Sequence, residues 1–293
     1  MNVRIIPRLD IKGPNLVKGI QLEGLRVLGK PEEFARHYYR EGVDELLFMD
    51  IVASLYQRDS ILRIVECTSR EIFIPLTVGG GLRTLDDIRA VLAAGADKVA
   101  INTAAVRRPE LISEVANRFG SSTIVVSVEA MRRGTGYEVY VDNGRERTGL
   151  DVFEWVRRAV ELGAGEIMVT AIDREGTGRG YDVPLVRHVA DLVSVPVIAC
   201  GGCGSLKDLE EVIEHGHPDA VCIASVLHYG VLAGRATVPP ASVKADLPAP
   251  LGAKTRFSRV QNATPAAIRS FLHERGIDGL CSRCCDTQQT EAT

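Results

Sequence analysis

The feature that most constrains the fold is an internal repeat. Segments that begin at Gly42, Ile74 and Asp97 have counterparts about 121 residues further along the chain. Two of these pairs are IPLTVGGGLRTLDDI with VPVIACGGCGSLKDL, and DKVAINTAAV with DAVCIASVLH. A repeat that covers both strand-like and helical segments indicates two similar halves related by duplication.

Each half alternates short apolar runs with helical patterns. Eight such runs are present: VRIIPRLD, DELLFMDI, IPLTVGGG, DKVAIN, STIVVSVE, EIMVTAID, VPVIACGG and AVCIAS. They are apolar on both faces, which is typical of parallel strands that helices cover. Eight strands that alternate with helices predict an α/β fold, a (β/α)8 TIM barrel built from two duplicated half-barrels.

The regular alternation covers most of the chain but not its C-terminal part. We expect a barrel core over residues 1–230, an irregular insertion over 231–262, the final barrel helix over 263–276 and a disordered tail over 277–293. In the final helix, Thr264 is the predicted N-cap and Pro265 the first helical residue.

Composition excludes several classes of function. The 293-residue chain has a net charge of −3 and contains no apolar run long enough to span a membrane. We therefore expect a cytoplasmic protein without a membrane or nucleic-acid partner. The seven cysteines form no regular disulfide framework, and the CxxC of Cys200 and Cys203 lacks a second pair at zinc-finger spacing. We expect neither a metal nor another cofactor.

Glycine-rich strand ends occur at equivalent positions of the two halves. In each half, the next strand-like run ends in a short segment that precedes a helix. The first set is Gly80, Gly81, Asn102 and Thr103, and the second is Gly201, Gly202, Ala224 and Ser225. Glycine lets backbone N–H groups approach an anion, and a hydroxyl at a helix start adds a donor. One such set is often only a tight turn, but the duplication predicts two phosphate sites and a doubly phosphorylated substrate.

Two carboxylates end strand-like runs in the two halves. Asp10 ends the first run and Glu129 the fifth, which places them on opposite sides of an eight-stranded barrel. Carboxylates that face each other across a barrel mouth suit a general acid and a general base. Alternatively, each is a solvated residue or an ion-pair partner of Arg8, Lys12 or Lys18.

Four charged residues begin strands at the other end of the barrel: Arg4, Glu45, Lys98 and Glu166. Strand starts form the barrel floor, whereas active sites of such barrels lie at the mouth. Two positive and two negative charges at one level can form a closed ring of ion pairs. The ring would be either a stabilising plug or a gate to a passage along the barrel axis.

The residues named so far lie in motifs that together resemble one enzyme family, the cyclase subunits of imidazole glycerol phosphate synthase. The motifs are RIIPRLDIKGPNLVKG, VDELLFMDIVAS, LTVGGGLR, GADKVAINTAAV, GAGEIMVTAIDREGTGRGYD, PVIACGG and ASVLH. The resemblance covers Val3 to Tyr229 and resumes over the last helix.

This resemblance implies a lyase of histidine biosynthesis that needs no cofactor. Ammonia released by a glutaminase partner, a class I amidotransferase, would pass through the barrel and attack a bis-phosphorylated formimino carboxamide ribonucleotide. The products would be imidazole glycerol phosphate and aminoimidazole carboxamide ribonucleotide. We therefore expect a heterodimer with the glutaminase.

The resemblance also implies roles for single residues. Asp10 and Glu129 match the catalytic pair, the four floor charges match the ammonia gate, and Asp97 matches the partner-docking face. The implied substrate- or phosphate-binding residues are Lys18 in a mobile loop after the first strand, Gly80, Gly81, Asn102, Thr103, Thr170, Glu175, Gly176, Gly201, Gly202, Ala224 and Ser225.

Five positions depart from the family pattern, and two of them are Cys200 and Cys203, which replace small residues. Glu129 stands where the family has aspartate, and a carboxyl displaced by about 1–1.5 Å can cost ~10²-fold in rate. Arg8 replaces a small residue, usually cysteine, and its guanidinium could pair with Asp10 or Glu129 and lower the pKa of that carboxyl. Glu175 also replaces an aspartate.

These departures leave other functions open. One is a paralogous ammonia-channelling synthase subunit that acts on another substrate, for example beside a sugar amidotransferase. Two less favoured functions are a half-barrel isomerase, which would need no glutaminase, and a non-catalytic scaffold that activates a glutaminase.

Overall fold

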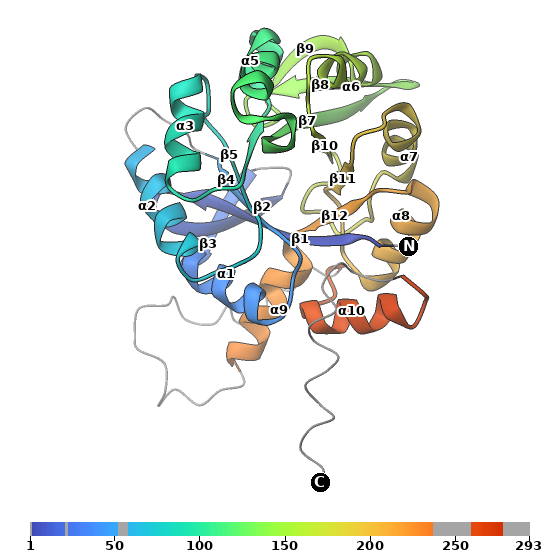
Figure 1. Ribbon diagram of the computed structural model, residues 1–293. Helices are drawn as coiled ribbons and strands as arrows, with labels where there is room; N and C mark the ends of the chain where they lie inside the picture. Colours follow the sequence, from blue (N-terminus) through green and yellow to red (C-terminus); the bar gives the residue numbers. More distant parts are fainter. Residues whose placement is uncertain (1, 21–22, 52–57, 237–258, 278–293) are drawn as a thin grey trace.

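The computed structural model describes residues 2–20, 23–51, 58–236 and 259–277, and its parallel strands form a closed barrel surrounded by helices (Figure 1). In order around the ring, the strands are β1 (Arg4–Lys12), β4 (Leu46–Asp50), β5 (Leu76–Gly79), β6 (Lys98–Ile101), β7 (Ile124–Arg133), β10 (Glu166–Ala171), β11 (Val197–Cys200) and β12 (Ala220–Ile223). The ring is closed because β12 pairs with β1 and β7 pairs with β10. The prediction of a (β/α)8 TIM barrel is confirmed.

Helices follow the barrel strands in both halves. They are α1 (Pro31–Arg40), α2 (Arg58–Ser69), α3 (Leu85–Ala93), α4 (Thr103–Arg107), α5 (Glu110–Phe119), α6 (Val152–Glu161), α7 (Val183–Leu192), α8 (Leu206–Gly216), α9 (Ser225–Ala236) and α10 (Pro265–His273), with a 3₁₀ turn at Ser121–Thr123. In each half two helices follow the fourth barrel strand, α4 and α5 after β6, and α9 and α10 after β12. The repeat in the sequence is therefore also a repeat in the structure.

The same repeat is visible in the caps of α3 and α8. Thr84 caps α3 and Ser205 caps α8, and each side chain accepts a hydrogen bond from the backbone N–H of an aspartate in the first turn. That aspartate accepts in return from the backbone N–H of the cap, which completes a capping box. Equivalent caps in both halves fix the direction in which each helix leaves its glycine-rich strand end.

Two β-hairpins extend the barrel, and the sequence did not predict them. β2 (Asn15–Ile20) and β3 (Glu23–Gly29) follow β1, while β8 (Gly136–Val141) and β9 (Glu146–Asp151) follow β7, all in antiparallel pairing. The expected ends of the first and fifth strands, at Asp10 and Glu129, are therefore wrong. Both strands continue past these residues because their outer segments pair with the hairpins.

Side chains of the barrel strands form two separate apolar layers. Those that point outward, such as Ile5 and Phe48, pack against the helices. Those that point inward form a second cluster of Ile6, Leu47, Ala100, Val125, Met168, Ile198, Cys200, Ala220 and Cys222. Because alternate residues of a strand share a face, Ile6 lies between the inward-facing Arg4 and Arg8 on β1. An apolar layer thus separates the charged floor from the charged mouth.

The C-terminal part differs from expectation at one boundary. α9 continues to Ala236, so residues 231–236 are helical and do not belong to an irregular insertion. α10 begins at Pro265, and the Thr264 hydroxyl accepts from the Ala267 N–H as its N-cap. Most of the expected insertion and nearly all of the expected tail lie outside the described residues. Within the described part, no helix combines the length and apolar character needed to cross a membrane.

Candidate active site at the barrel mouth

The two predicted catalytic carboxylates lie on opposite barrel strands. Asp10 is on β1 and Glu129 on β7, with three strands between them in either direction around the ring. Both side chains are buried, with exposed fractions of 3% for Asp10 and 7% for Glu129. A buried carboxyl must either be paired with a cation or change its pKa, and these two residues differ in this respect.

Asp10 is held by two cations. Arg8 Nε donates to Asp10 Oδ1 at 2.8 Å, and Lys18 Nζ lies 3.8 Å from Oδ2. Burial alone would raise the pKa of Asp10, but the charges of Arg8 and Lys18 bring it below its usual value. The structure therefore contains the pairing with Arg8 that the sequence left as an alternative. It keeps Asp10 ionised at neutral pH.

Lys18 belongs to β2 and is buried, so it does not lie in the loop that the family resemblance implied. Its ammonium also forms an ion pair with the Glu175 carboxylate, which follows β10. Arg8, Asp10, Lys18 and Glu175 thus form one network with two positive and two negative charges. This network joins the hairpin of the first half to the strand ends of the second.

Glu129 has a different environment. The backbone N–H of Gly144 donates to Glu129 Oε2 at 2.7 Å, and no cation forms an ion pair with Glu129 among the described residues. Burial raises the pKa of Glu129 to about 7, although the Arg8 charge and the Gly144 hydrogen bond oppose this shift. Near neutral pH, Glu129 can therefore hold or release a proton.

The tip of the β8–β9 hairpin lies across the mouth. Asp142, Asn143 and Gly144 have positive φ angles of 53°, 56° and 74°. The Asp142 N–H donates to Thr103 Oγ1 at 3.0 Å, and Asn143 Nδ2 donates to the Ile51 carbonyl at 2.8 Å. This turn was not among the predictions, although Asn-Gly after the alternating run YEVYV is a strong hairpin signal.

This hairpin meets the first predicted phosphate site. Asn102 Nδ2 donates to the Tyr140 carbonyl at 3.2 Å, and Thr103 accepts from the hairpin tip as described. Gly80 and Gly81 follow β5, and a Cβ at Gly80 would overlap the Asp50 carbonyl at the end of β4. The four residues predicted for this site therefore follow the neighbouring strands β5 and β6, and two of them, Asn102 and Thr103, contact the hairpin.

The second predicted phosphate site is a pocket. It is lined by Arg8, Glu175, Gly176, Cys200, Gly201, Gly202, Cys203, Cys222, Ala224 and Ser225. The structure thus brings together all four residues of the second set with two residues implied by the family resemblance. Gly202 has a φ of 108°, and a Cβ there would overlap the Gly180 carbonyl, so only glycine fits. Thr170, also implied, is buried beside Cys200 on the neighbouring strand.

In the sequence, Arg8 was an alternative ion-pair partner of the carboxylates and a departure from the family pattern, but not a predicted residue of the phosphate site. The structure makes it the residue that joins the carboxylate network to this pocket. The neutral His228 supports its backbone, because Nε2 donates to the Arg8 carbonyl at 2.9 Å while Nδ1 accepts from the Tyr38 hydroxyl at 2.6 Å. Burial lowers the pKa of His228 to about 3.

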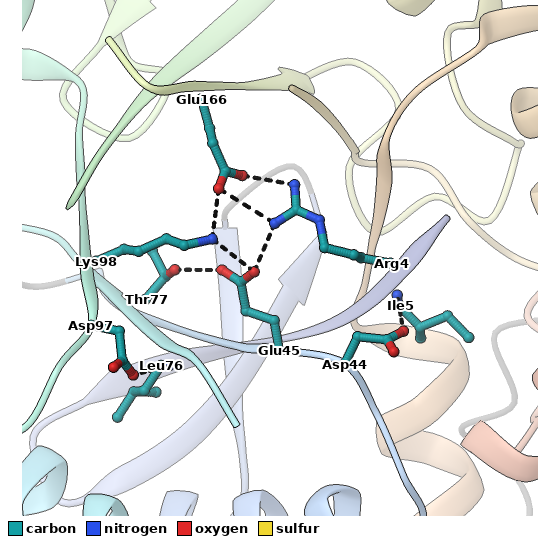
Figure 2. Close-up of polar contacts among 9 residues, drawn as sticks. All are labelled: Arg4, Ile5, Asp44, Glu45, Leu76, Thr77, Asp97, Lys98 and Glu166. Atoms are coloured by element: carbon teal, nitrogen blue, oxygen red, sulfur yellow. Dashed lines mark hydrogen bonds and ion pairs between the residues drawn. The ribbon is translucent and has the colours of Figure 1, made fainter. Parts of the chain in front are cut away.

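The four floor charges form a closed ring, as Figure 2 shows. Arg4 pairs with Glu45 at 2.9 Å and with Glu166 at 2.8 Å, while Lys98 pairs with the same two carboxylates at 3.0 and 2.6 Å. Thr77 Oγ1 also donates to Glu45 at 2.7 Å. The ring joins residues at the starts of four barrel strands, β1, β4, β6 and β10, across the floor of the barrel.

Asp97, the predicted docking residue, lies beside this ring in Figure 2 and is exposed. Its Oδ2 accepts from the Leu76 backbone N–H at 2.9 Å, just as Asp219 accepts from Val197 in the other half. Asp97 therefore has a structural role at the start of β5. Its role in docking stays a prediction.

A metal site is not formed by the described residues, where no three His, Cys, Asp or Glu side chains come together suitably. Cys200 and Cys203, the CxxC of the sequence, both line the second pocket. Cys281, Cys284 and Cys285 lie outside the described residues.

Comparisons with known proteins identify the family. Residues 4–233 match the family model described as histidine biosynthesis protein. The imidazole glycerol phosphate synthase subunit HisF of Legionella pneumophila is 57% identical to the chain over 208 residues, which cover 71% of this chain and 98% of that protein. The chain therefore belongs to the histidine biosynthesis protein family.

Proposed function

We propose that the chain is the cyclase subunit of an imidazole glycerol phosphate synthase. It uses ammonia from a glutaminase partner to convert a bis-phosphorylated formimino carboxamide ribonucleotide to imidazole glycerol phosphate and aminoimidazole carboxamide ribonucleotide. The observation that carries this proposal is the pair of buried carboxylates on opposite strands, whose pKa values are shifted in opposite directions.

The two carboxylates have different roles in this proposal. Asp10, which Arg8 and Lys18 keep ionised, is the general base. Glu129, whose pKa is about 7, is the general acid and supplies a proton on the opposite face of the substrate. Environments that push two carboxyl pKa values apart are the usual basis for such a division.

Two phosphate groups hold the substrate between these carboxylates. The pocket at Gly202 and Ser225 binds one phosphate, through backbone N–H groups and the hydroxyl at the start of α9. Gly81, Asn102 and Thr103 bind the other. Because the β8–β9 hairpin already contacts Asn102 and Thr103, its tip must move when that phosphate enters.

Ammonia reaches the mouth from the floor. The glutaminase docks on the floor around Asp97, and the ion-pair ring must open for a molecule to enter the barrel axis. The apolar layer above the ring favours neutral ammonia over ammonium, because a charged ion would lose its hydration there. The heterodimer therefore delivers the nucleophile without exposing it to water.

A direct assay tests the proposal. The purified chain, supplied with ammonium salts and the bis-phosphorylated ribonucleotide, should form imidazole glycerol phosphate in proportion to the free ammonia concentration. Isomerisation of the ribonucleotide without ammonia, with no imidazole glycerol phosphate formed when ammonia is supplied, would favour the half-barrel isomerase. Binding of a glutaminase without turnover of any bis-phosphorylated ligand, even with ammonia supplied directly, would favour the non-catalytic scaffold.

The second candidate is the paralogous ammonia-channelling subunit with another substrate. The presence of Glu129, Glu175 and Arg8 at the mouth favours it, because these residues alter the carboxyl positions and charges that face the substrate. Complementation of a histidine auxotroph that lacks the cyclase separates the two functions. Robust growth supports the histidine cyclase, whereas failure of a well-expressed chain supports the paralogue.

A further inference from the structure

Arg8 is a buried guanidinium that the proposed acid–base chemistry does not use directly. Its side chain is 5% exposed and lies inside the barrel, two residues before Asp10 on the same strand. Nε donates to Asp10 Oδ1 at 2.8 Å, and Nη1 donates to Cys200 Sγ at 3.6 Å. A thiol is a weak acceptor, so only the first of these bonds is strong.

The remaining nitrogen of Arg8, Nη2, makes no hydrogen bond to any residue that the structure describes. Donors of a buried guanidinium normally have acceptors, and an arginine fork is well suited to a second anionic oxygen. Arg8 lines the same pocket as Gly201, Gly202 and Ser225. The pocket thus has a buried cation in the wall that also presents glycine N–H groups and a hydroxyl.

The carboxylates at this pocket are already paired with cations. Glu175 is paired with Lys18, and Asp10 is paired with Arg8 and with the same lysine. An anion that enters the pocket therefore meets no unpaired carboxylate there. It meets backbone donors that glycine lets approach closely, and the free edge of Arg8.

We propose that Arg8 is a ligand of the anion in this pocket, with Nη2 donating to an oxygen of a phosphate monoester held by Gly202 and Ser225. This inference rests on the proposed function and deepens it, since it names a residue that selects the phosphorylated end of the substrate. One guanidinium then contacts both the phosphate and Asp10. Binding of the phosphate orients the general base.

Binding of glycerol 3-phosphate to the full chain tests the inference. Calorimetric titrations are made in a Thr103→Val background, which weakens the other phosphate site. Arg8→Met should reduce affinity about tenfold to a hundredfold, because a charge-assisted hydrogen bond is lost. Arg8→Lys should bind glycerol 3-phosphate more tightly than Arg8→Met but less tightly than the parent, which here is the Thr103→Val protein. Arg36→Met, which breaks an exposed pair with Glu71, is the matched control and should leave affinity unchanged.

Ser225→Ala separates this inference from the phosphate site itself. If Ser225→Ala weakens binding while Arg8→Met binds like the parent, the role of Arg8 is overturned and the phosphate pocket stands. If the parent does not bind glycerol 3-phosphate at all, the pocket fails as a phosphate site and the inference fails with it.

A second measurement uses the unmodified protein, in case Arg8→Met does not fold. The Arg8 Nε–H resonance, identified by its absence from the spectrum of Arg8→Lys, should shift as glycerol 3-phosphate is added. The shift should saturate at the concentration at which the calorimetric signal saturates. An unchanged resonance at saturating ligand would overturn the inference.

Discussion

Asp10 and Glu129 are both buried at the same end of the barrel, yet among the residues that the structure describes only Asp10 has cations in ion-pair contact. The position of each carboxylate could be read from the sequence, because both end apolar runs at equivalent points of the repeat. The protonation state of each carboxylate could not be predicted from the sequence. It depends on Lys18, which a hairpin carries back to Asp10, and on Gly144, which a second hairpin carries back to Glu129.

The raised pKa of Glu129 has a consequence for stability. Between the ordinary pKa of 4.5 and about 7, the folded chain binds more protons at this site than the unfolded chain does. The free energy of unfolding therefore falls as pH rises through this range, by an amount on the order of 3 kcal/mol. Glu129→Gln removes the ionisation, so it should be more stable relative to the parent at pH 8 than at pH 5.

Urea denaturation of both proteins at the two pH values measures this difference. Glu138→Gln is a useful control, because Glu138 lies on the neighbouring strand and its pKa is lowered by Arg147. If the difference between Glu129→Gln and the parent were the same at pH 5 and pH 8, the raised pKa would be wrong.

The two hairpins are the elements that distinguish this site from the rest of the barrel, because they bring Lys18 to Asp10 and Gly144 to Glu129. The barrel strands were predictable because a buried parallel strand is a continuous apolar run, and the helices because their caps and glycines recur. The hairpins carry mixed segments such as Asn15–Ile20 and Glu146–Asp151, whose strand character comes from pairing with β1 and with β8, respectively. The sequence therefore located the two carboxylates, but neither the true ends of β1 and β7 nor the hairpins that follow them.

Gly144 links the tip of the β8–β9 hairpin to Glu129. Its φ of 74° lies in the left-handed region, so Gly144→Ala should cost about 1–2 kcal/mol and loosen the hydrogen bond to Oε2. Because that bond lowers the pKa of Glu129, its loss should raise the pKa above about 7. The alkaline limb of the pH–rate profile should then move to higher pH.

Gly134→Ala is the matched control for this prediction. Gly134 has a φ of 56° in the turn between β7 and β8, and a Cβ there would meet nothing within 4 Å. It should lose similar stability while its pH–rate profile stays at the parent position. Equal shifts in both variants would show that strain in the hairpin, and not the bond to Glu129, controls the profile.

At the scale of the whole molecule, the barrel has three levels along its axis. A charged ring lies at the floor, an apolar layer above it and a charged network at the mouth. The repeat and the strand starts were sufficient to predict the floor ring, since every member begins or precedes a barrel strand. The network at the mouth was not predictable, because Lys18 and Glu175 lie far apart in the sequence and meet only in the folded chain.

Lys98→Met tests whether the floor ring is a gate or a plug. The variant removes two ion pairs and should cost about 1–3 kcal/mol, because Glu45 and Glu166 each lose a charged donor. If the ring is a gate, the variant should also impair the delivery of ammonia from the glutaminase to the barrel mouth. Turnover with glutamine and a glutaminase partner should fall more than turnover with ammonium salts.

Arg89→Met is the control for that experiment, because it breaks only an exposed pair with Asp86 on α3. It should change stability by less than about 1 kcal/mol and leave both rates unchanged. If Lys98→Met lowered stability but kept the ratio of the two rates, the ring would be a plug only.

The central claim is that two opposed carboxylates act as a general acid and a general base on one bis-phosphorylated substrate. Ammonia-driven turnover of the ribonucleotide by the parent, Asp10→Asn and Glu129→Gln tests it most directly, with folding of each variant checked by its urea transition. We predict turnover by the parent and a loss of at least ~10²-fold in each variant. Turnover by both variants at the parent rate would contradict the claim.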